Sequence, residues 1–337
     1  MLLYYFLFLQ LFHNSTTLNE MRRFSGQEAT VRASKELDAF KTSTPHAVEL
    51  SAAVEGGDVD KLKTLLTAGD ASIDLVHLAI RSNNPQSLTA ILPCQTDVNQ
   101  ANSDGISAVH LTAAYGYAKI FEVLLQQDHV NANAAATEQF TPLHLAAQNG
   151  NKEAVIALQH NGADVNARTA STQSTPLHLA AKYGQTKVIK TLLRNGADVD
   201  AKDLEGWTPL QHAARCGNVA VVTAFVDVQA DLVGRAATTK SASSCDDDVK
   251  DTPLQIAASA GHAGAVNAFL HRPEMKNAVQ GRRVDDPVST RVAAKVLKHL
   301  LTNDADANVA RPSFGAESLT KSDARKTEVV ATLLPAL

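Results

Sequence analysis

Apolar residues recur along this chain in a pattern that predicts a series of helix pairs. In the clearest copy, Val188, Ile189, Leu192 and Leu193 have the i, i+1, i+4, i+5 spacing of one apolar helix face. Most copies of the closing apolar pair are 31 to 34 residues apart, with a short step of 26 near the start and a long step of 44 before Phe269. A fixed period of this length is typical of a stacked repeat array, in which each unit buries its apolar face against its neighbours. The closing residues are Leu65-Leu66, Ile91-Leu92, Leu124-Leu125, Leu158, Leu192-Leu193, Phe225-Val226, Phe269-Leu270, Leu300-Leu301 and Leu333-Leu334.

A polar signal with a similar period marks where each first helix begins and ends. Thr-Pro-Leu starts a copy at Thr141, Thr175, Thr208 and Thr252. Proline suits the first helical position, because its missing N–H has no partner inside the helix there. A glycine such as Gly184 closes the run, where a helix commonly ends in the left-handed conformation. Each unit is therefore expected to be a helix hairpin followed by a loop.

The copies resemble ankyrin repeats. The resemblance is carried by Gln173-Ser-Thr-Pro-Leu-His-Leu-Ala-Ala-Lys-Tyr-Gly184, by Lys187-Val-Ile-Lys-Thr-Leu-Leu193 and by Asn195-Gly-Ala-Asp-Val-Asp200. It implies an all-α solenoid of stacked helix-turn-helix units with short β-hairpin loops, with nine units from about Val48 to the C-terminus. We divide the chain into a hydrophobic N-terminal segment (1–20), an N-terminal helix and linker (21–47), ankyrin repeats with a degenerate first unit (48–272) and degenerate C-terminal ankyrin-like repeats (273–337).

An insertion interrupts the array at Asp231–Asp251. It is rich in Ala, Thr, Ser and Asp, and this composition predicts an enlarged flexible loop. Its acidic run, Asp246-Asp-Asp248, lacks the spacing of carboxylates around a turn that a calcium loop requires. Upstream of the array, Ser25-Gly-Gln-Glu28 has the form of a capping box and predicts the start of a helix.

The charge balance argues against nucleic acid as the main ligand. The chain has 31 Lys and Arg against 35 Asp and Glu, a formal net charge of -4 at pH 7, whereas phosphate binding needs a concentrated basic face. Cys94, Cys216 and Cys245 have neither the spacing of zinc ligands nor that of a disulfide framework, which favours a reducing compartment. We therefore expect a cytoplasmic or nuclear protein.

The apolar run Met1–Phe12 leaves the compartment open. It is too short to cross a bilayer as a helix, which takes about 20 residues. It has the length of a signal-peptide core, but no basic n-region and no small-x-small cleavage site lie near it. Three interpretations remain: a poor signal peptide, a hydrophobic anchor, or an upstream extension with the true start at Met21. A functional signal would make the protein secreted or membrane-associated; otherwise we expect no membrane contact.

The recurring histidines predict a structural role rather than catalysis or metal binding. His77, His110, His144 and His178 occupy one helical position per unit, so they would lie in a row, too far apart to share an ion. In ankyrin repeats this histidine hydrogen-bonds neighbouring backbone, and the resemblance assigns these four the same role. Glutamine replaces it at Gln211, which suits bracing but not proton transfer. No serine lies in a Gly-x-Ser-x-Gly elbow, and the glycines fall at repeat turns. We therefore expect no enzyme activity, cofactor, metal or small-molecule substrate.

The resemblance also implies where a partner would bind. In ankyrin arrays, contacts come from the residue before each threonine and the two residues before each glycine, which line a concave groove. Here these positions hold the only tryptophan, Trp207, and two of the three tyrosines outside the N-terminal run. Trp, Tyr and Arg are the types that dominate interface energies; the alternative is that Phe140 and Trp207 pack against adjacent loop tips. The predicted contact residues are Ile106, Tyr115, Phe140, Gln148, Asn149, Lys182, Tyr183, Trp207 and Arg215.

The sequence therefore predicts a monomeric, non-catalytic adaptor or scaffold that binds a protein partner. Two alternatives remain: a regulatory or inhibitory subunit of a kinase, phosphatase or protease, and a secreted or membrane-associated effector. Asn166, eight residues after Leu158, is similar to asparagines that are hydroxylated in other ankyrin repeats. The alternative there is a loop asparagine chosen for its tolerance of tight turns.

Overall fold

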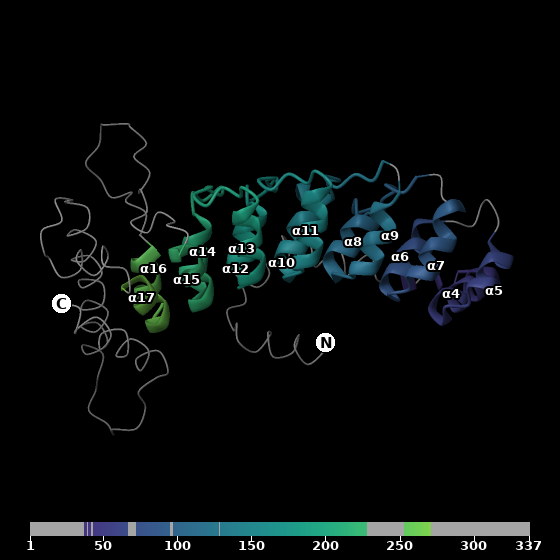
Figure 1. Ribbon diagram of the computed structural model, residues 1–337, viewed down its shortest axis with the longest axis horizontal. Helices are drawn as coiled ribbons and strands as arrows, with labels where there is room; N and C mark the ends of the chain where they lie inside the picture. Colours follow the sequence, from purple (N-terminus) through teal and green to yellow (C-terminus); the bar gives the residue numbers. More distant parts are fainter. Residues whose placement is uncertain are drawn as a thin grey trace, which may run out of the picture. The chain divides into compact units, whose positions relative to one another are not determined.

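The computed structural model describes residues 37–38, 40–41, 43–66, 72–94, 97–127, 129–227 and 253–270. The expectations for Met1–Phe12, for a helix at Ser25, for the insertion Asp231–Asp251 and for the last two units lie outside these residues. The chain divides into two compact units, Met1–Pro176 and Leu177–Leu337. The described residues of both units are built from successive helix pairs (Figure 1).

In the first unit, the helices stack like on like. First helices contact first helices, α4 on α6, α6 on α8 and α8 on α10, and second helices stack in the same order, α5 on α7, α7 on α9 and α9 on α11. Two short 3-10 turns lie in the connections: η1 directly follows α7, and η2 lies between α9 and α10. The bounds are α4 Pro45–Gly56, α5 Val59–Leu65, α6 Ile73–Arg81, α7 Pro85–Ile91, η1 Leu92–Cys94, α8 Ala108–Tyr115, α9 Ala118–Leu125, η2 Thr137–Gln139, α10 Pro142–Asn149 and α11 Lys152–His160.

The second unit continues the same arrangement. Helix α14 packs on α16, while α13 packs on α15 and α15 on α17. The bounds are α12 Pro176–Lys182, α13 Thr186–Arg194, α14 Pro209–Cys216, α15 Val219–Asp227, α16 Pro253–Ser259 and α17 Ala263–Leu270. Among the helices of the described ranges, none is both long and apolar enough to span a membrane.

The expected helix signals act where the sequence places them. The Thr208 hydroxyl accepts the N–H of Gln211 at 3.3 Å, and Pro209 is the first residue of α14. Gly217 ends α14 with φ 68°, in the left-handed region. The predicted apolar face of α13 is buried, with Val188, Ile189 and Leu192 all at 0% exposure. Local signals therefore fix the ends of the helices, and stacking buries their faces.

The loops between repeats are turns closed by single antiparallel hydrogen bonds. The described residues contain no strand, only an isolated antiparallel bridge between Ala101 and Ser107. In four loops a backbone N–H donates to the carbonyl of the residue two positions before the next first helix begins. The bonds are Asn102 N to Ile106 O at 3.0 Å, Ala136 N to Phe140 O at 2.8 Å, Thr169 N to Ser174 O at 3.1 Å and Asp203 N to Trp207 O at 3.0 Å. The all-α ankyrin-type fold is confirmed.

A side chain from the following repeat caps the end of the first helix α8. Asn151 Nδ2 donates to the carbonyls of Ala113 and Ala114 at 2.8 Å each, in the last turn of α8. It can do so because Gly116, which ends α8, has no side chain: a Cβ there would lie 2.6 Å from the Asn151 amide. The glycine thus serves both the turn and the contact between repeats.

Candidate functional site

The bracing histidines of the first unit link adjacent repeats. The N–H of Ser107 donates to His110 Nδ1 at 3.2 Å, and His110 Nε2 lies 3.1 Å from the Phe140 carbonyl oxygen. His144 repeats this geometry with Thr141 at 3.2 Å and Ser174 at 3.1 Å. Because a backbone N–H can only donate, Nδ1 must be the acceptor and the proton must sit on Nε2. Each ring is thus a neutral bridge from one repeat to the next.

Burial fixes this neutral state. It lowers the pKa of His110 to about 4, while hydrogen bonds to backbone oppose the change. In the second unit His178 Nε2 lies 3.0 Å from the Trp207 carbonyl oxygen. The structural role that the resemblance implied is therefore confirmed for His110, His144 and His178.

His77 departs from the expected role. Its Nε2 is buried without a hydrogen-bond partner among the described residues. Asp74 stands three residues before it, where Ser107 stands before His110, and the N-cap of α6, Ser72, makes no side-chain cap bond. Burial, followed by the charge of His110, lowers the pKa of His77 to about 3. It is a neutral core histidine rather than a brace.

Three of the predicted contact residues lie inside the stack. Ile106, Phe140 and Gln148 are only 1%, 6% and 3% exposed. The expectation that they present their side chains to a partner is corrected: Ile106 and Phe140 are buried at the ends of loops, and Gln148 is buried in the last turn of α10. The backbone carbonyl of Phe140 is also occupied, because it accepts the hydrogen bond from His110 Nε2.

Two predicted residues of the first unit remain at the surface. Tyr115 is half-buried and stacks on Tyr117 with ring centroids 5.4 Å apart and an interplanar angle of 7°. Asn149 is exposed, but its amide donates to the Ala114 carbonyl at 2.9 Å. This surface is polar and aromatic, and part of it is already used to join repeats.

The remaining four predicted residues belong to the second unit. Lys182 ends α12 and Tyr183 follows it, while Trp207 precedes α14 and Arg215 lies in its last turn. Arg215 is exposed, and its guanidinium carbon lies 5.4 Å from the centroid of the Trp207 ring, within cation–π range. Lys182, Tyr183 and Trp207 are partly exposed. The structure thus places partly exposed aromatic groups and two cationic groups on adjacent repeats.

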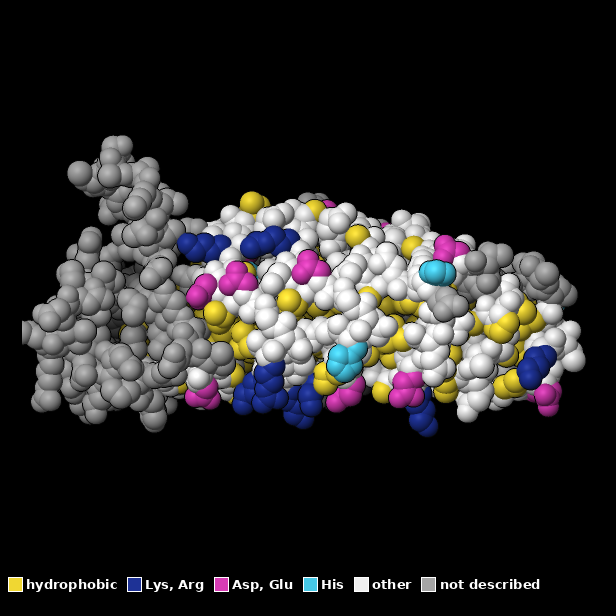
Figure 2. Space-filling model, turned by 45° about the horizontal axis from the view of Figure 1, so that its top comes forward, with side chains coloured by type: hydrophobic (Ala, Val, Ile, Leu, Met, Phe, Trp, Pro, Cys, Tyr) yellow, Lys and Arg dark blue, Asp and Glu magenta, His cyan; other side chains and the backbone are white. Residues whose placement is uncertain are grey.

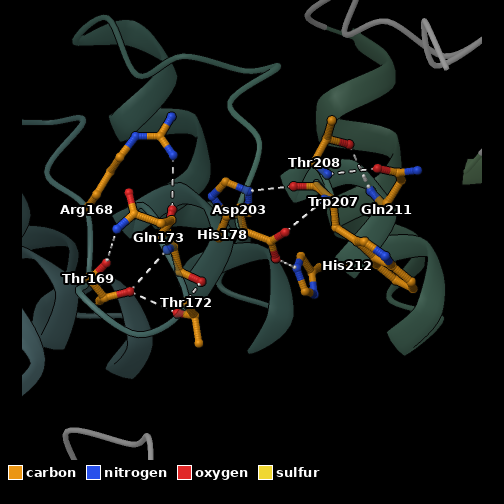
Figure 3. A network of polar contacts seen from close by, with 11 residues as sticks. Arg168, Thr169, Thr172, Gln173, His178, Asp203, Trp207, Thr208, Gln211 and His212 are labelled. Carbon is orange, nitrogen blue, oxygen red and sulfur yellow. Dashed lines mark hydrogen bonds and ion pairs between the residues drawn. The ribbon is translucent and has the colours of Figure 1, made fainter. Parts of the chain in front are cut away.

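A hydrogen-bonded network holds Trp207 in place (Figure 3). Asp203 Oδ1 accepts the backbone N–H of Trp207 at 2.8 Å, and Asp203 Oδ2 lies 2.8 Å from His212 Nε2. The His212 ring lies 5.4 Å from the Trp207 ring and 5.8 Å from that of His178. Burial raises the pKa of Asp203, but the hydrogen bonds from His212 and the Trp207 N–H outweigh it, so the pKa is lowered. Asp203 is therefore held as a carboxylate.

Asp203 and His212 were not predicted as part of the site. The available signal was a displaced histidine: His212 stands where Leu145 and Leu179 stand in the two preceding repeats, one residue after the bracing Gln211. A polar ring at an apolar position needs a partner. Asp203 supplies it from the loop.

Two further properties of the described residues bear on function: how charge is distributed over the surface, and whether side chains are grouped so that they could bind a metal ion. On the face seen in Figure 2, Lys and Arg side chains lie among Asp and Glu side chains rather than in a block of one sign. In the described ranges, no group of three or more His, Cys, Asp and Glu side chains is arranged to hold a metal ion.

Comparison with known proteins places the repeats in a family. A family model described as ankyrin repeats (3 copies) matches residues 76–169 and 168–236. The chain is 28% identical over 208 residues to the Neurospora crassa protein named ankyrin repeat protein nuc-2, covering 59% of this chain and 16% of that protein. It is 33% identical over 90 residues to human transient receptor potential cation channel subfamily A member 1, covering 26% and 8%.

A third relative is also similar over only a short part of its length. The chain is 29% identical over 93 residues to the mouse nuclear factor NF-kappa-B p105 subunit, covering 27% of this chain and 10% of that protein. The chain therefore spans less than a fifth of the length of these relatives.

Proposed function

The chain is an ankyrin repeat protein, and from this premise we propose that it is a non-catalytic adaptor or scaffold whose exposed first-helix ends bind a protein partner. Ankyrin repeats generally mediate protein–protein interaction. The observation that carries the proposal is the stacked pair of Trp207 and Arg215, with Lys182 and Tyr183 at the end of the neighbouring first helix. We call these four residues the aromatic–cationic surface.

The aromatic–cationic surface has the composition of an interface centre. Trp, Tyr and Arg are enriched among residues that cost ~2 kcal/mol or more when truncated in an interface. The backbone of Trp207 is bound by Asp203 and its ring packs against His212, so less conformational entropy is lost when a partner binds. A standard interface needs about 800 Å² from each partner, so we expect neighbouring repeats to contribute as well.

The compartment is part of the same proposal. Of the described cysteines, Cys94 and Cys216 are free thiols, and Cys216 is exposed. An exposed thiol persists in a reducing compartment. We therefore propose that the protein works in the cytoplasm or nucleus, as a monomer.

A double variant tests the proposed surface. Trp207→Ala with Tyr183→Ala should reduce the amount of partner captured by the tagged full-length chain from its native cell by at least tenfold. The melting temperature should change little, because both side chains lie at the surface. Lys190→Ala, an exposed position on the second helix α13, is the control and should preserve capture. Equal loss of capture and stability in the double variant would show that these residues are part of the core instead.

An activity assay on the captured partner separates an adaptor from an inhibitory subunit. An adaptor leaves the partner's activity unchanged when the full-length chain is added back. A kinase, phosphatase or protease that loses activity in proportion to bound chain would favour the regulatory role.

A further inference from the structure

Two consecutive repeats carry a cation at the same helix position. Lys182 is the last residue of α12, and Arg215 is the equivalent residue of α14. Among the other repeats, α6 also carries a cation at this position, Arg81, which is paired with Asp38, whereas Ala114, Gln148 and Ser259 are uncharged. Lys182 and Arg215 differ from Arg81 in lying on consecutive repeats.

Helices α12 and α14 lie side by side at this point. The His178 brace from α12 reaches the Trp207 carbonyl, and the rings of His178 and His212 are 5.8 Å apart. Lys182 and Arg215 are near enough for the charge of Arg215 to act on the Lys182 ammonium. The fold thus places the positive charges of Lys182 and Arg215 at the ends of two adjacent first helices.

Trp207 fixes the position of one of these charges. The Arg215 guanidinium lies over the indole ring, 5.4 Å from its centroid. A stacked guanidinium keeps its N–H donors in the plane of the group, free to bind a carboxylate in bidentate fashion. The indole in turn packs against the His212 ring, and the backbone N–H of Trp207 donates to Asp203. Arg215 is therefore pre-organised.

Neither cation is neutralised by an ion pair. Within the described part of the chain, no carboxylate lies within 4.0 Å of the Lys182 ammonium or the Arg215 guanidinium. The Asp203 carboxylate is occupied by His212 and by the Trp207 N–H. Burial and the charge of Arg215 lower the pKa of Lys182, against the opposing effects of Cys216, Glu205 and Asp203. A carboxylate bound beside Lys182 would stabilise its charged form and so offset the effects of burial and of Arg215.

We propose that Lys182 and Arg215 form a two-cation clamp that binds an Asp or Glu side chain of the protein partner, with Trp207 as a positioning residue. This inference rests on the proposed function and names the chemistry of the partner at that surface. Two cations on a chain of net charge -4 are too few for a nucleic-acid backbone. They match a single carboxylate within a protein segment.

Peptide selection tests the clamp directly. The full-length chain is screened against a display library of random dodecapeptides, and the selected peptides should share an acidic residue at one fixed position. Changing that residue to its amide, or making Lys182→Gln or Arg215→Gln in the protein, should each weaken binding at least tenfold. Combining the peptide change with Arg215→Gln should cost little more than either change alone, because both remove the same contact.

The outcomes separate the clamp from the wider proposal. Peptides without an acidic preference whose binding still requires Trp207 and Tyr183 would overturn the clamp and leave the proposed surface standing. Peptides that ignore all four residues, or no binding peptide at all, would overturn both. Trp207→Phe, which preserves an aromatic platform, should retain binding better than Trp207→Ala if the ring acts by positioning Arg215.

Cys216 offers a probe that needs no partner. Cys216 is an exposed residue; partial burial raises the pKa of its thiol, and the charges of Lys182 and Arg215 act in the opposite direction. The anionic reagent iodoacetate, compared with neutral iodoacetamide, should lose about twofold in relative rate at Cys216 for each cation replaced by glutamine, because a single nearby charge in water contributes only a fraction of a kcal/mol. Cys94 should not change. An unchanged ratio at Cys216 would contradict a shared positive potential at this site.

Discussion

Acidification should destabilise the first unit through its buried histidines, and His110→Gln should remove part of that sensitivity. In the folded chain the pKa of His110 is lowered from 6.5 to about 4, so the unfolded state binds the proton first as the pH falls. The stability that His110 contributes is therefore fully present above about pH 6.5 and is lost as the pH approaches 4. Glutamine is a suitable replacement because Gln211 already fills the same helix-capping position: its Oε1 accepts the Thr208 N–H at 2.8 Å.

The size of the effect follows from the shift. Each pKa unit corresponds to about 1.4 kcal/mol, so protonation coupled to His110 should cost about 2.5 kcal/mol by about pH 4.5. His77, with its pKa lowered to about 3, should cost a similar amount. Carboxylates titrate in the same range and contribute equally to both proteins. The difference between wild type and His110→Gln therefore reports His110 together with its effect on the pKa of His77.

Urea unfolding followed by far-ultraviolet circular dichroism, at several pH values from about 7.5 to about 4.5, measures this difference. The free energy of unfolding of wild type should fall relative to His110→Gln by about 2.5 kcal/mol across the range. NMR titration supplies a second readout, in which the His110 Cε1–H should keep its neutral shift down to about pH 5. Parallel pH profiles for the two proteins, or a His110 that titrates near pH 6.5, would refute the reasoning.

Other changes test the stacking itself. Gly116→Ala and Gly162→Ala both place a side chain at positive φ, 75° and 77°, which costs ~1–2 kcal/mol. Only the first also meets a neighbour, the Asn151 amide at 2.6 Å, so urea midpoints should show Gly116→Ala to be less stable by a further ~1 kcal/mol; equal losses would contradict a role for Asn151. Leu192→Asp buries a charge at a site of 0% exposure and should abolish most of the helical signal of the second unit at 25 °C, whereas Lys190→Asp at an exposed site should preserve it.

The elements were predictable because their signals are local. Thr208, Pro209 and Gly217 each specify a helix end by their own conformational preferences, and the structure places them as expected. The bracing role could be assigned by resemblance wherever a hydroxyl residue stands three positions before the histidine, as Ser107 does before His110. It failed at His77, where that residue is Asp74.

The site was only partly predictable because it depends on contacts between loop and helix. The residue before each first helix is chemically mixed, and the pattern could not tell that Phe140 turns inward while Trp207 stays partly exposed. Asp203 and His212 are nine positions apart, and only the fold of the loop brings their side chains within 2.8 Å. Non-local geometry, not residue type, decides which predicted contacts are usable.

The central claim is that the partner sits on the first-helix ends rather than on the outer helices. Replacing Tyr183 by a photo-crosslinking phenylalanine, in the full-length chain in its native cell, measures this directly, with the same replacement at Lys190 on α13 as the matched position. The account predicts that irradiation joins a partner protein to position 183 and not to position 190. A partner joined at position 190 alone, or equally at both, would contradict it.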